Sequence, residues 1–225
     1  KDAQAIKLIK KRTRVPLVAD IHFDYRLALE VIENGIDKVR INPGNIGGEW
    51  RIRQVLQLAK EKGLPVRFGI NGGSLEADIY DKYGGVTSDA LVESVMRSVK
   101  IAEEENFENL VISLKSSDVR EVYEAYKKLS KLTDFPLHIG VTEAGTAYRG
   151  IIKSAMALGG LLLEGIGDTM RISLTADPTE EVKAAKEMLR SLGILKEGVE
   201  IISCPTCGRT EIDLIGLAHQ VEKEF

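Results

Sequence analysis

The stretch IRQVLQLAKEKGLPVRFGINGG, residues 52–73, contains one complete copy of the unit from which this chain is built. Apolar residues at spacings i, i+3, i+4 and i+7 predict a helix over Ile52–Lys62 that lays one face against a sheet. Gly63 ends that helix, and Pro65 opens a short apolar strand, Val66–Ile70. A helix followed by a short buried strand is the unit of α/β proteins.

The same alternation continues along the whole chain. The predicted strands are Leu17–Asp20, Lys38–Asn42, Val66–Ile70, Asn109–Leu114, Leu137–Val141 and Met170–Leu174. The predicted helices between and after them are Tyr25–Asn34, Ile52–Lys62, Ser88–Glu105, Val119–Leu132, Thr146–Leu158 and Thr179–Leu192. Six strand–helix units fit either a doubly wound sheet or most of a TIM barrel, which has eight units and about 250 residues. In a barrel, the two other strands would lie upstream of Lys1.

Composition indicates a soluble globular protein with a large core. The chain has 225 residues, 44% of them hydrophobic, with a net charge of −3. This charge argues against nucleic-acid binding and against binding to a membrane surface, and no apolar run approaches the ~18 residues of a membrane span. Two cysteines exclude a disulfide framework, so the cytoplasm is the expected compartment.

Both ends of the sequence suggest a piece of a longer protein. Lys1 is not an initiator methionine, and a helical pattern is already running in the first residues. Gly193–Gly198 is the expected linker, and a helix is predicted over Ile212–Glu224. We therefore expect a barrel domain over residues 1–195 and the beginning of a second domain over residues 196–225.

The carboxyl ends of the predicted strands are unusually polar, and this is where α/β proteins place their chemistry. Side chains in a strand alternate with period two, so each strand-end polar pair shares one face. These pairs are Arg40 with Asn42, Arg67 with Asn71, and Arg171 with Ser173. The residues between them are apolar, which places the polar face in the barrel interior.

Four cations from four strands should therefore meet at one mouth: Arg40, Arg67, Lys115 and Arg171. A single arginine at a strand end is more often structural, but four in register are harder to explain in that way. Burying like charges costs several kcal/mol per ion, in order of magnitude, unless counter-charges are present. Acidic side chains are too few at these ends, so we expect an anionic ligand, most simply phosphate or diphosphate.

Other polar residues also stand near the strand ends. Glu143 follows a strand and is suited to proton transfer or to orienting a hydroxyl group. His22 alone would more often be a core or rim histidine, and His138 is expected to be structural. The segment Leu75–Tyr83 is predicted to be a solvated loop over the mouth that could act as a lid.

The two cysteines stand three positions apart in Ser203-Cys204-Pro205-Thr206-Cys207. Thiolates held on such a turn can bind one soft metal, but zinc and iron–sulfur clusters normally take about four ligands. From its residues alone, the pair is half of a metal site of open identity.

Five motifs, in order, resemble the 4-hydroxy-3-methylbut-2-enyl diphosphate synthase family, the iron–sulfur enzymes of the non-mevalonate isoprenoid pathway. They are Val39–Gly47, Val66–Leu75, Gly140–Gly145, Gly165–Ser173 and Ser203–Arg209. The resemblance covers essentially the whole chain. It implies a TIM (β/α)8 barrel, here with six of its eight units, followed by the start of a small α+β domain that carries a 4Fe-4S cluster.

The resemblance also implies what the site does. The family converts 2-C-methyl-D-erythritol 2,4-cyclodiphosphate to 4-hydroxy-3-methylbut-2-enyl diphosphate with electrons from flavodoxin or ferredoxin. Glu143 would be the catalytic carboxylate, and Cys204 and Cys207 two cluster ligands, the others lying downstream. Half a ligand set cannot hold a cluster and the missing first two strands leave the barrel open, so the fragment alone should be inactive. The family also works as a homodimer in which the cluster domain of one subunit closes the barrel of the other. The implied substrate-binding residues are His22, Arg40, Arg67, Asn71, Lys115, Arg171 and Ser173.

Two other interpretations remain open at this point. One is a phosphate-binding barrel, either a lyase or a pterin-type transferase, whose cysteine pair binds structural zinc. The other is a non-catalytic module whose basic mouth holds a phosphorylated effector.

Overall fold

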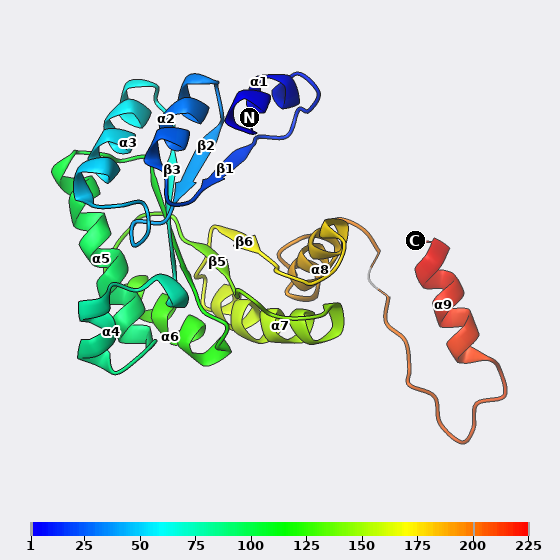
Figure 1. The fold of residues 1–225 in the computed structure, drawn as a ribbon. Helices are drawn as coiled ribbons and strands as arrows, with labels where there is room; N and C mark the ends of the chain where they lie inside the picture. The colour runs from blue at the N-terminus through cyan, green and yellow to red at the C-terminus, as the bar shows by residue number, and fades with distance from the viewer. Residues whose placement is uncertain (1, 200, 225) are drawn as a thin grey trace. The chain divides into compact units, whose positions relative to one another are not determined.

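The computed structural model describes residues 2–199 and 201–224. The chain divides after Ala185 into two compact units. The first contains every strand, with helices around them, and the second contains the end of α8 (Pro178–Ser191) and α9 (Leu214–Glu224) (Figure 1). None of the helices in the described ranges is long and apolar enough to cross a membrane.

The strands are parallel, and each lies beside the next one along the chain. β1 to β4 form one sheet, β5 and β6 form another, and a single bridge between Ile112 and Leu137 joins the two. A doubly wound sheet reverses its strand order at a switch point, whereas this order never reverses. The order therefore selects the barrel. The strands are β1 (Val18–Ile21), β2 (Lys38–Ile41), β3 (Val66–Asn71), β4 (Leu110–Lys115), β5 (His138–Gly140) and β6 (Thr169–Arg171).

Helices surround the strands on their outer side (Figure 1). Those preceding α8 are α1 (Asp2–Lys10), α2 (Tyr25–Glu33), α3 (Glu49–Glu61), α4 (Ala77–Tyr83), α5 (Ser88–Glu104), α6 (Val119–Leu129) and α7 (Ala147–Leu163). The helices α2, α5 and α6 begin at N-cap residues whose side chains accept hydrogen bonds from backbone N–H groups of the first turn. The N-cap residue is Asp24 for α2, Thr87 for α5 and Asp118 for α6. These caps fix where each helix begins: α2 after β1, α6 after β4, and α5 after α4.

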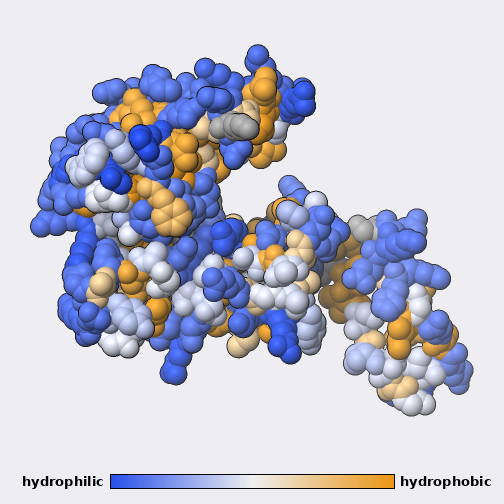
Figure 2. All heavy atoms as spheres, viewed as in Figure 1, coloured by the Kyte–Doolittle hydropathy of each residue, from blue (hydrophilic) through white to orange (hydrophobic). Residues whose placement is uncertain are grey.

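The apolar core lies between the strands and the helices. In β3, Val66, Phe68 and Ile70 are completely buried, while Arg67 and Asn71 alternate with them on the opposite face. Hydrophilic residues cover most of the outer surface in Figure 2, and hydrophobic side chains reach it around α1 and β1. The alternation of apolar and polar residues along the strands puts the charged residues of the strands inside the barrel.

The segment Leu75–Tyr83, predicted to be a loop, contains the helix α4, so that prediction is wrong. Ile79 is completely buried on its inner face, and this packing holds the helix against α5. Seven residues are too few to show a clear helical period in the sequence. The helix α7 also differs from expectation, because it runs through Gly159 and Gly160 to Leu163. Burial of Leu161 outweighs the low helix propensity of the glycine pair.

The seam between β4 and β5 is held by a buried tyrosine as well as by the single bridge. The Tyr126 hydroxyl accepts a hydrogen bond from the Leu114 N–H (2.8 Å) and donates one to the His138 carbonyl (2.7 Å). Burial raises the pKa of Tyr126 well above its usual value, so the hydroxyl keeps its proton. One side chain of α6 therefore joins the two sheets.

We expect Tyr126→Phe to lower the free energy of unfolding by about 2 kcal/mol, because it leaves a buried N–H and a buried carbonyl without their partner. Urea denaturation of the full-length protein measures this change. Tyr80→Phe is the matched control, since Tyr80 is half exposed on α4. Equal stability of the two variants would show that Tyr126 does not hold the seam.

Candidate active site

The structure brings the four predicted cations together inside the barrel. In the strand register Asp20 pairs with Arg40, Arg40 with Arg67, Asn71 with Lys115, and Gly140 with Arg171. Arg40 and Lys115 are only 5% and 4% exposed. Among the described residues, Asp20 is the one carboxylate that forms an ion pair with any of the four. The interior therefore carries an excess of buried positive charge.

Arg40 is held by three groups. Its Nη1 donates to Asp20 Oδ1 (2.7 Å) and lies 2.8 Å from His22 Nε2, while Nη2 donates to the Gly69 carbonyl (2.9 Å). A guanidinium only donates, so His22 Nε2 accepts and the imidazole proton lies on Nδ1. Asn45 lies 3.3 Å from that Nδ1. The Asn45 atom that faces this nitrogen is Nδ2, and its Oδ1 is buried without a hydrogen-bond partner in the described structure.

Gly69 leaves the space that Arg40 occupies. A Cβ atom at this position would lie 2.3 Å from Arg40 Nε and 2.8 Å from Nη2. Any side chain on this residue would therefore displace the guanidinium. A glycine in the interior of β3 weakens the strand, and here it allows a buried cation to lie flat against the backbone.

Crowding of the cations shifts their proton affinity. Burial, and then Arg171, Arg67 and Arg40, lower the pKa of Lys115 to about 6. The pKa of Arg67 is also lowered, first by burial and then by Arg40. The Nε atoms of Arg67 and Arg171 are buried without a hydrogen-bond partner in the described structure. Buried donors that lack partners are unfavourable, so a ligand that accepts from them would be bound strongly.

A cavity of about 360 Å³ opens at the carboxyl ends of the strands. Three of the predicted residues line it: His22, Asn71 and Glu143. Glu143 lies in the loop after β5, exposed, with a φ of +53°, a conformation that a non-glycine residue rarely adopts. Ser173, two residues beyond Arg171, is half-buried and is not among the lining residues. The four cations are not among them either, because they lie on the strands below the loops that form the cavity wall.

Several residues of this site were not selected from the sequence. Asp20 shares a strand face with His22, so the period-two pattern could have found it. No pattern in the sequence singles out the polar residues that the loops bring to the cavity from different strand ends. They are Asn45, Ser74, Ser116, Ser117 and Thr142.

The cysteine pair lies in the second unit. Cys204 and Cys207 are both exposed and free. The pKa of the Cys207 thiol is lowered by hydrogen bonds from the backbone and then the side chain of Arg209, which favours the thiolate that metals bind. The described residues contain no group of three or more His, Cys, Asp or Glu placed to hold a metal. They therefore provide two of the about four ligands of a cluster.

Solved structures share this fold at low sequence identity. A dihydropteroate synthase of Yersinia pestis superposes with a TM-score of 0.51 and 15% identity, over 85% of this chain and 71% of that one. A type I 3-dehydroquinate dehydratase of Clostridium difficile superposes with a TM-score of 0.57 and 14% identity, over 85% and 77%. At this level of identity the likeness shows the fold alone.

Curated relatives are far more similar. The chain is 60% identical over its whole length to a protein of Fusobacterium nucleatum, and 59% identical to one of Caldanaerobacter subterraneus over 99% of its length. Both are named 4-hydroxy-3-methylbut-2-en-1-yl diphosphate synthase (flavodoxin), and the chain spans 64% and 63% of their lengths. The GcpE TIM-barrel domain matches residues 1–186. The family predicted from the five motifs is thereby confirmed, and the chain belongs to the GcpE family.

Proposed function

We propose that the protein to which this chain belongs catalyses the reductive ring opening and dehydration of 2-C-methyl-D-erythritol 2,4-cyclodiphosphate, a step in isoprenoid precursor biosynthesis. The product is 4-hydroxy-3-methylbut-2-enyl diphosphate. The excess of buried cations in the barrel carries this proposal, because a diphosphate group supplies the negative charge that they lack. The names of the curated relatives support the choice of reaction.

The residues divide into two groups by what they can do. Arg40, Arg67, Lys115 and Arg171 bind the diphosphate oxygens, and the two unpartnered Nε atoms donate to it. His22 and Asn71, which line the cavity, orient the sugar-derived part through its hydroxyl groups, and Ser173 stays a predicted contact. Donors that are already in place where diphosphate charge develops lower the barrier to its departure.

The reaction consumes two electrons and two protons. One carbon–oxygen bond to the diphosphate breaks, the ring opens, and one water molecule leaves, which balances substrate and product. Glu143 lines the cavity from a loop and is exposed, so it can exchange protons with solvent. We assign to it the proton transfer that accompanies the loss of water.

The electrons require a redox group, and Cys204 and Cys207 are suited to half of a 4Fe-4S ligand set. Because two thiolates do not hold such a cluster, the remaining ligands come from residues outside this chain. The cluster, when bound, supplies single-electron transfer to the substrate. We propose that residues 196–225 begin its domain, that two copies form a homodimer with the active site shared between them, and that flavodoxin or ferredoxin is the donor.

Turnover of the cyclodiphosphate by the full-length, anaerobically purified protein tests the proposal. We expect a brown protein that forms the product with reduced flavodoxin, and a Glu143→Gln variant with kcat lowered tenfold or more. Glu108→Gln is the matched control, because Glu108 is exposed just before β4, at the opposite ends of the strands. It should keep full activity.

Three results would each contradict a different part of this proposal. A colourless protein with stoichiometric zinc would contradict the redox reaction. A protein that binds the cyclodiphosphate without converting it would instead be a binding module. Unchanged turnover in Glu143→Gln would remove the role given to that carboxylate.

A further inference from the structure

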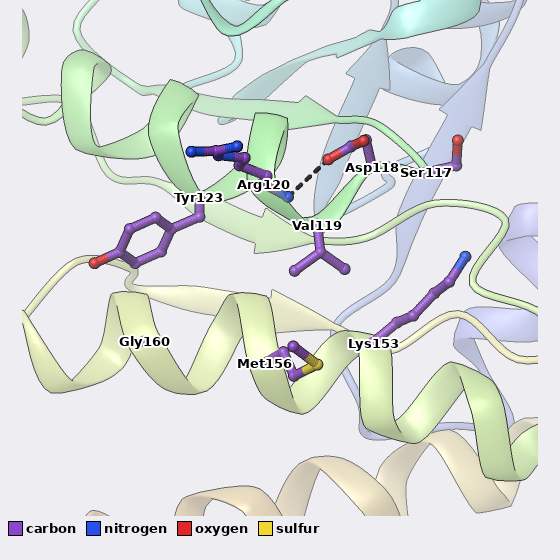
Figure 3. A pocket seen from close by; sticks show the side chains of 8 residues that line it. All are labelled: Ser117, Asp118, Val119, Arg120, Tyr123, Lys153, Met156 and Gly160. Carbon is purple, nitrogen blue, oxygen red and sulfur yellow. Dashed lines mark hydrogen bonds between the residues drawn. The ribbon is translucent and has the colours of Figure 1, made fainter.

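A groove lies on the outside of the barrel, between α6 and α7, and it adjoins the cavity at the mouth. It has a volume of about 670 Å³ and is lined by residues of the loop before α6 and of both helices. Figure 3 shows Val119 and Tyr123 on the α6 side, facing Met156 and Lys153 on α7. Ser117 lines both this groove and the cavity at the mouth. Whatever occupies the groove therefore lies next to the candidate active site.

The surface of α7 beside the groove is apolar and uncovered. Tyr148 is 79% exposed, Met156 66% and Leu163 74%, and Ile152 is exposed between them. Their spacing places them on one stripe of the helix, roughly 22 Å long at 1.5 Å per residue. Gly160 lets Tyr123 of α6 pack closely, because a Cβ there would lie 3.0 Å from its ring. Met156 belongs to this stripe and also lines the groove, so the apolar floor of the groove adjoins the stripe.

Cations border this floor. Arg120 and Lys153 line the groove, and Arg149 is exposed on the same side of α7 as the stripe. Nearby carboxylates are already engaged: Asp118 accepts the first N–H groups of α6, and Glu164 accepts from Tyr123 and Lys127. Three cations, Arg120, Arg149 and Lys153, therefore stand against the one carboxylate that lines the groove, Asp118. An apolar surface with such a net positive rim matches a partner whose apolar contact surface is surrounded by acidic residues.

We propose that this groove and the α7 stripe form the docking surface for an acidic electron-carrier protein. The inference rests on the proposed function, in which two electrons must be delivered at the mouth. A second copy of this chain fits less well. A two-fold interface would pair the patch with itself and would bring the cations of one copy close to the cations of the other. Electron-transfer partners form small, transient interfaces of less than about 1,200 Å², which a single helix stripe and groove can provide.

Charge reversal at the rim tests the docking surface. Reduced flavodoxin, the carrier printed in the names of the relatives, is titrated into the full-length protein and into a Lys153→Glu variant. We expect the variant to bind flavodoxin about tenfold more weakly, with a shallower dependence on salt. Lys100→Glu is the matched control, because Lys100 is exposed on α5 and makes the same charge change away from the groove. Its affinity should equal that of the parent protein.

Turnover separates docking from chemistry. With flavodoxin as donor, KM for flavodoxin should rise about tenfold in Lys153→Glu, whereas reduced methyl viologen should support unchanged turnover. A Met156→Ser variant, altered at an exposed apolar position, should behave in the same way. Equal losses with both donors, a matching effect of Lys100→Glu, or a change of oligomeric state in Met156→Ser would overturn the docking surface. Absence of turnover with either donor would refute the proposed function, while the titration would still decide the docking.

Discussion

Replacing Gly69 by alanine is expected to abolish most of the affinity of the protein for diphosphate. The new methyl group would lie 2.3 Å from Arg40 Nε, so the guanidinium must leave its place on β3. It would then lose its bonds to Asp20 and to the Gly69 carbonyl. Removing one partner of a buried charge pair costs about 2–5 kcal/mol. We therefore expect affinity to fall by about 10² to 10³-fold.

Calorimetric titration of the full-length protein with inorganic diphosphate measures this loss. Gly159→Ala serves as the control, because no atom lies within 4 Å of a Cβ at that position, which is far along α7 from the cations. A thermal melt accompanies each titration, so that loss of the fold is distinguished from loss of the site. If Gly69→Ala melts like the parent protein and still binds diphosphate with parental affinity, Arg40 is not a ligand of the anion.

Replacing Lys115 by methionine is expected to stabilise the protein while weakening anion binding. The amine is buried among three arginines, and this surrounding lowers its pKa to about 6. The unfolded chain has an ordinary lysine, which holds its proton up to about pH 10.4. Between these values the unfolded state binds more protons, so stability rises with pH in this window. Methionine removes both the cost of burial and this pH dependence, a gain of roughly 1–4 kcal/mol near neutral pH.

Anion binding should have the opposite pH dependence. A bound anion raises the pKa of Lys115, so binding takes up a proton. Affinity is then greatest below about pH 6 and falls by up to tenfold per unit of pH above it. Sulfate is the suitable ligand, because its own charge does not change in this range. Parallel slopes for the parent protein and Lys115→Met, in sulfate titrations or in urea unfolding across pH, would disprove this account of Lys115.

Most of the fold could be predicted because its signals are local. The strands are short β-branched runs bounded by Gly and Pro, and their predicted bounds agree with β1 to β4 to within one residue at each end. Sequence signals fail to predict an element where the burial of a side chain outweighs the local helix propensity. The helix α4 depends on one buried side chain, Ile79, and α7 continues through two glycines because Leu161 is buried beyond them.

The candidate site could be predicted only in part, for a similar reason. Strand periodicity places Arg40, Arg67 and Arg171 on interior faces, since that position depends on the strand alone. The contribution of Asn45 and Thr142 depends on how separate loops fold over the strand ends, which no local pattern encodes. The role of Gly69 is equally hidden, because it is defined by an arginine on the neighbouring strand.

The seam between β4 and β5 divides the cations unequally. Arg40, Arg67 and Lys115 belong to the first sheet and Arg171 to the second. The two sheets are joined by the Ile112–Leu137 bridge, by the hydroxyl of Tyr126 and by a hydrogen bond from the Thr142 N–H to the Ser116 carbonyl (3.2 Å). A multivalent anion held by both groups therefore adds a further connection between the two sheets. Binding of the substrate then also strengthens the connection between the two sheets, so occupancy of the site and stability of the barrel wall are coupled.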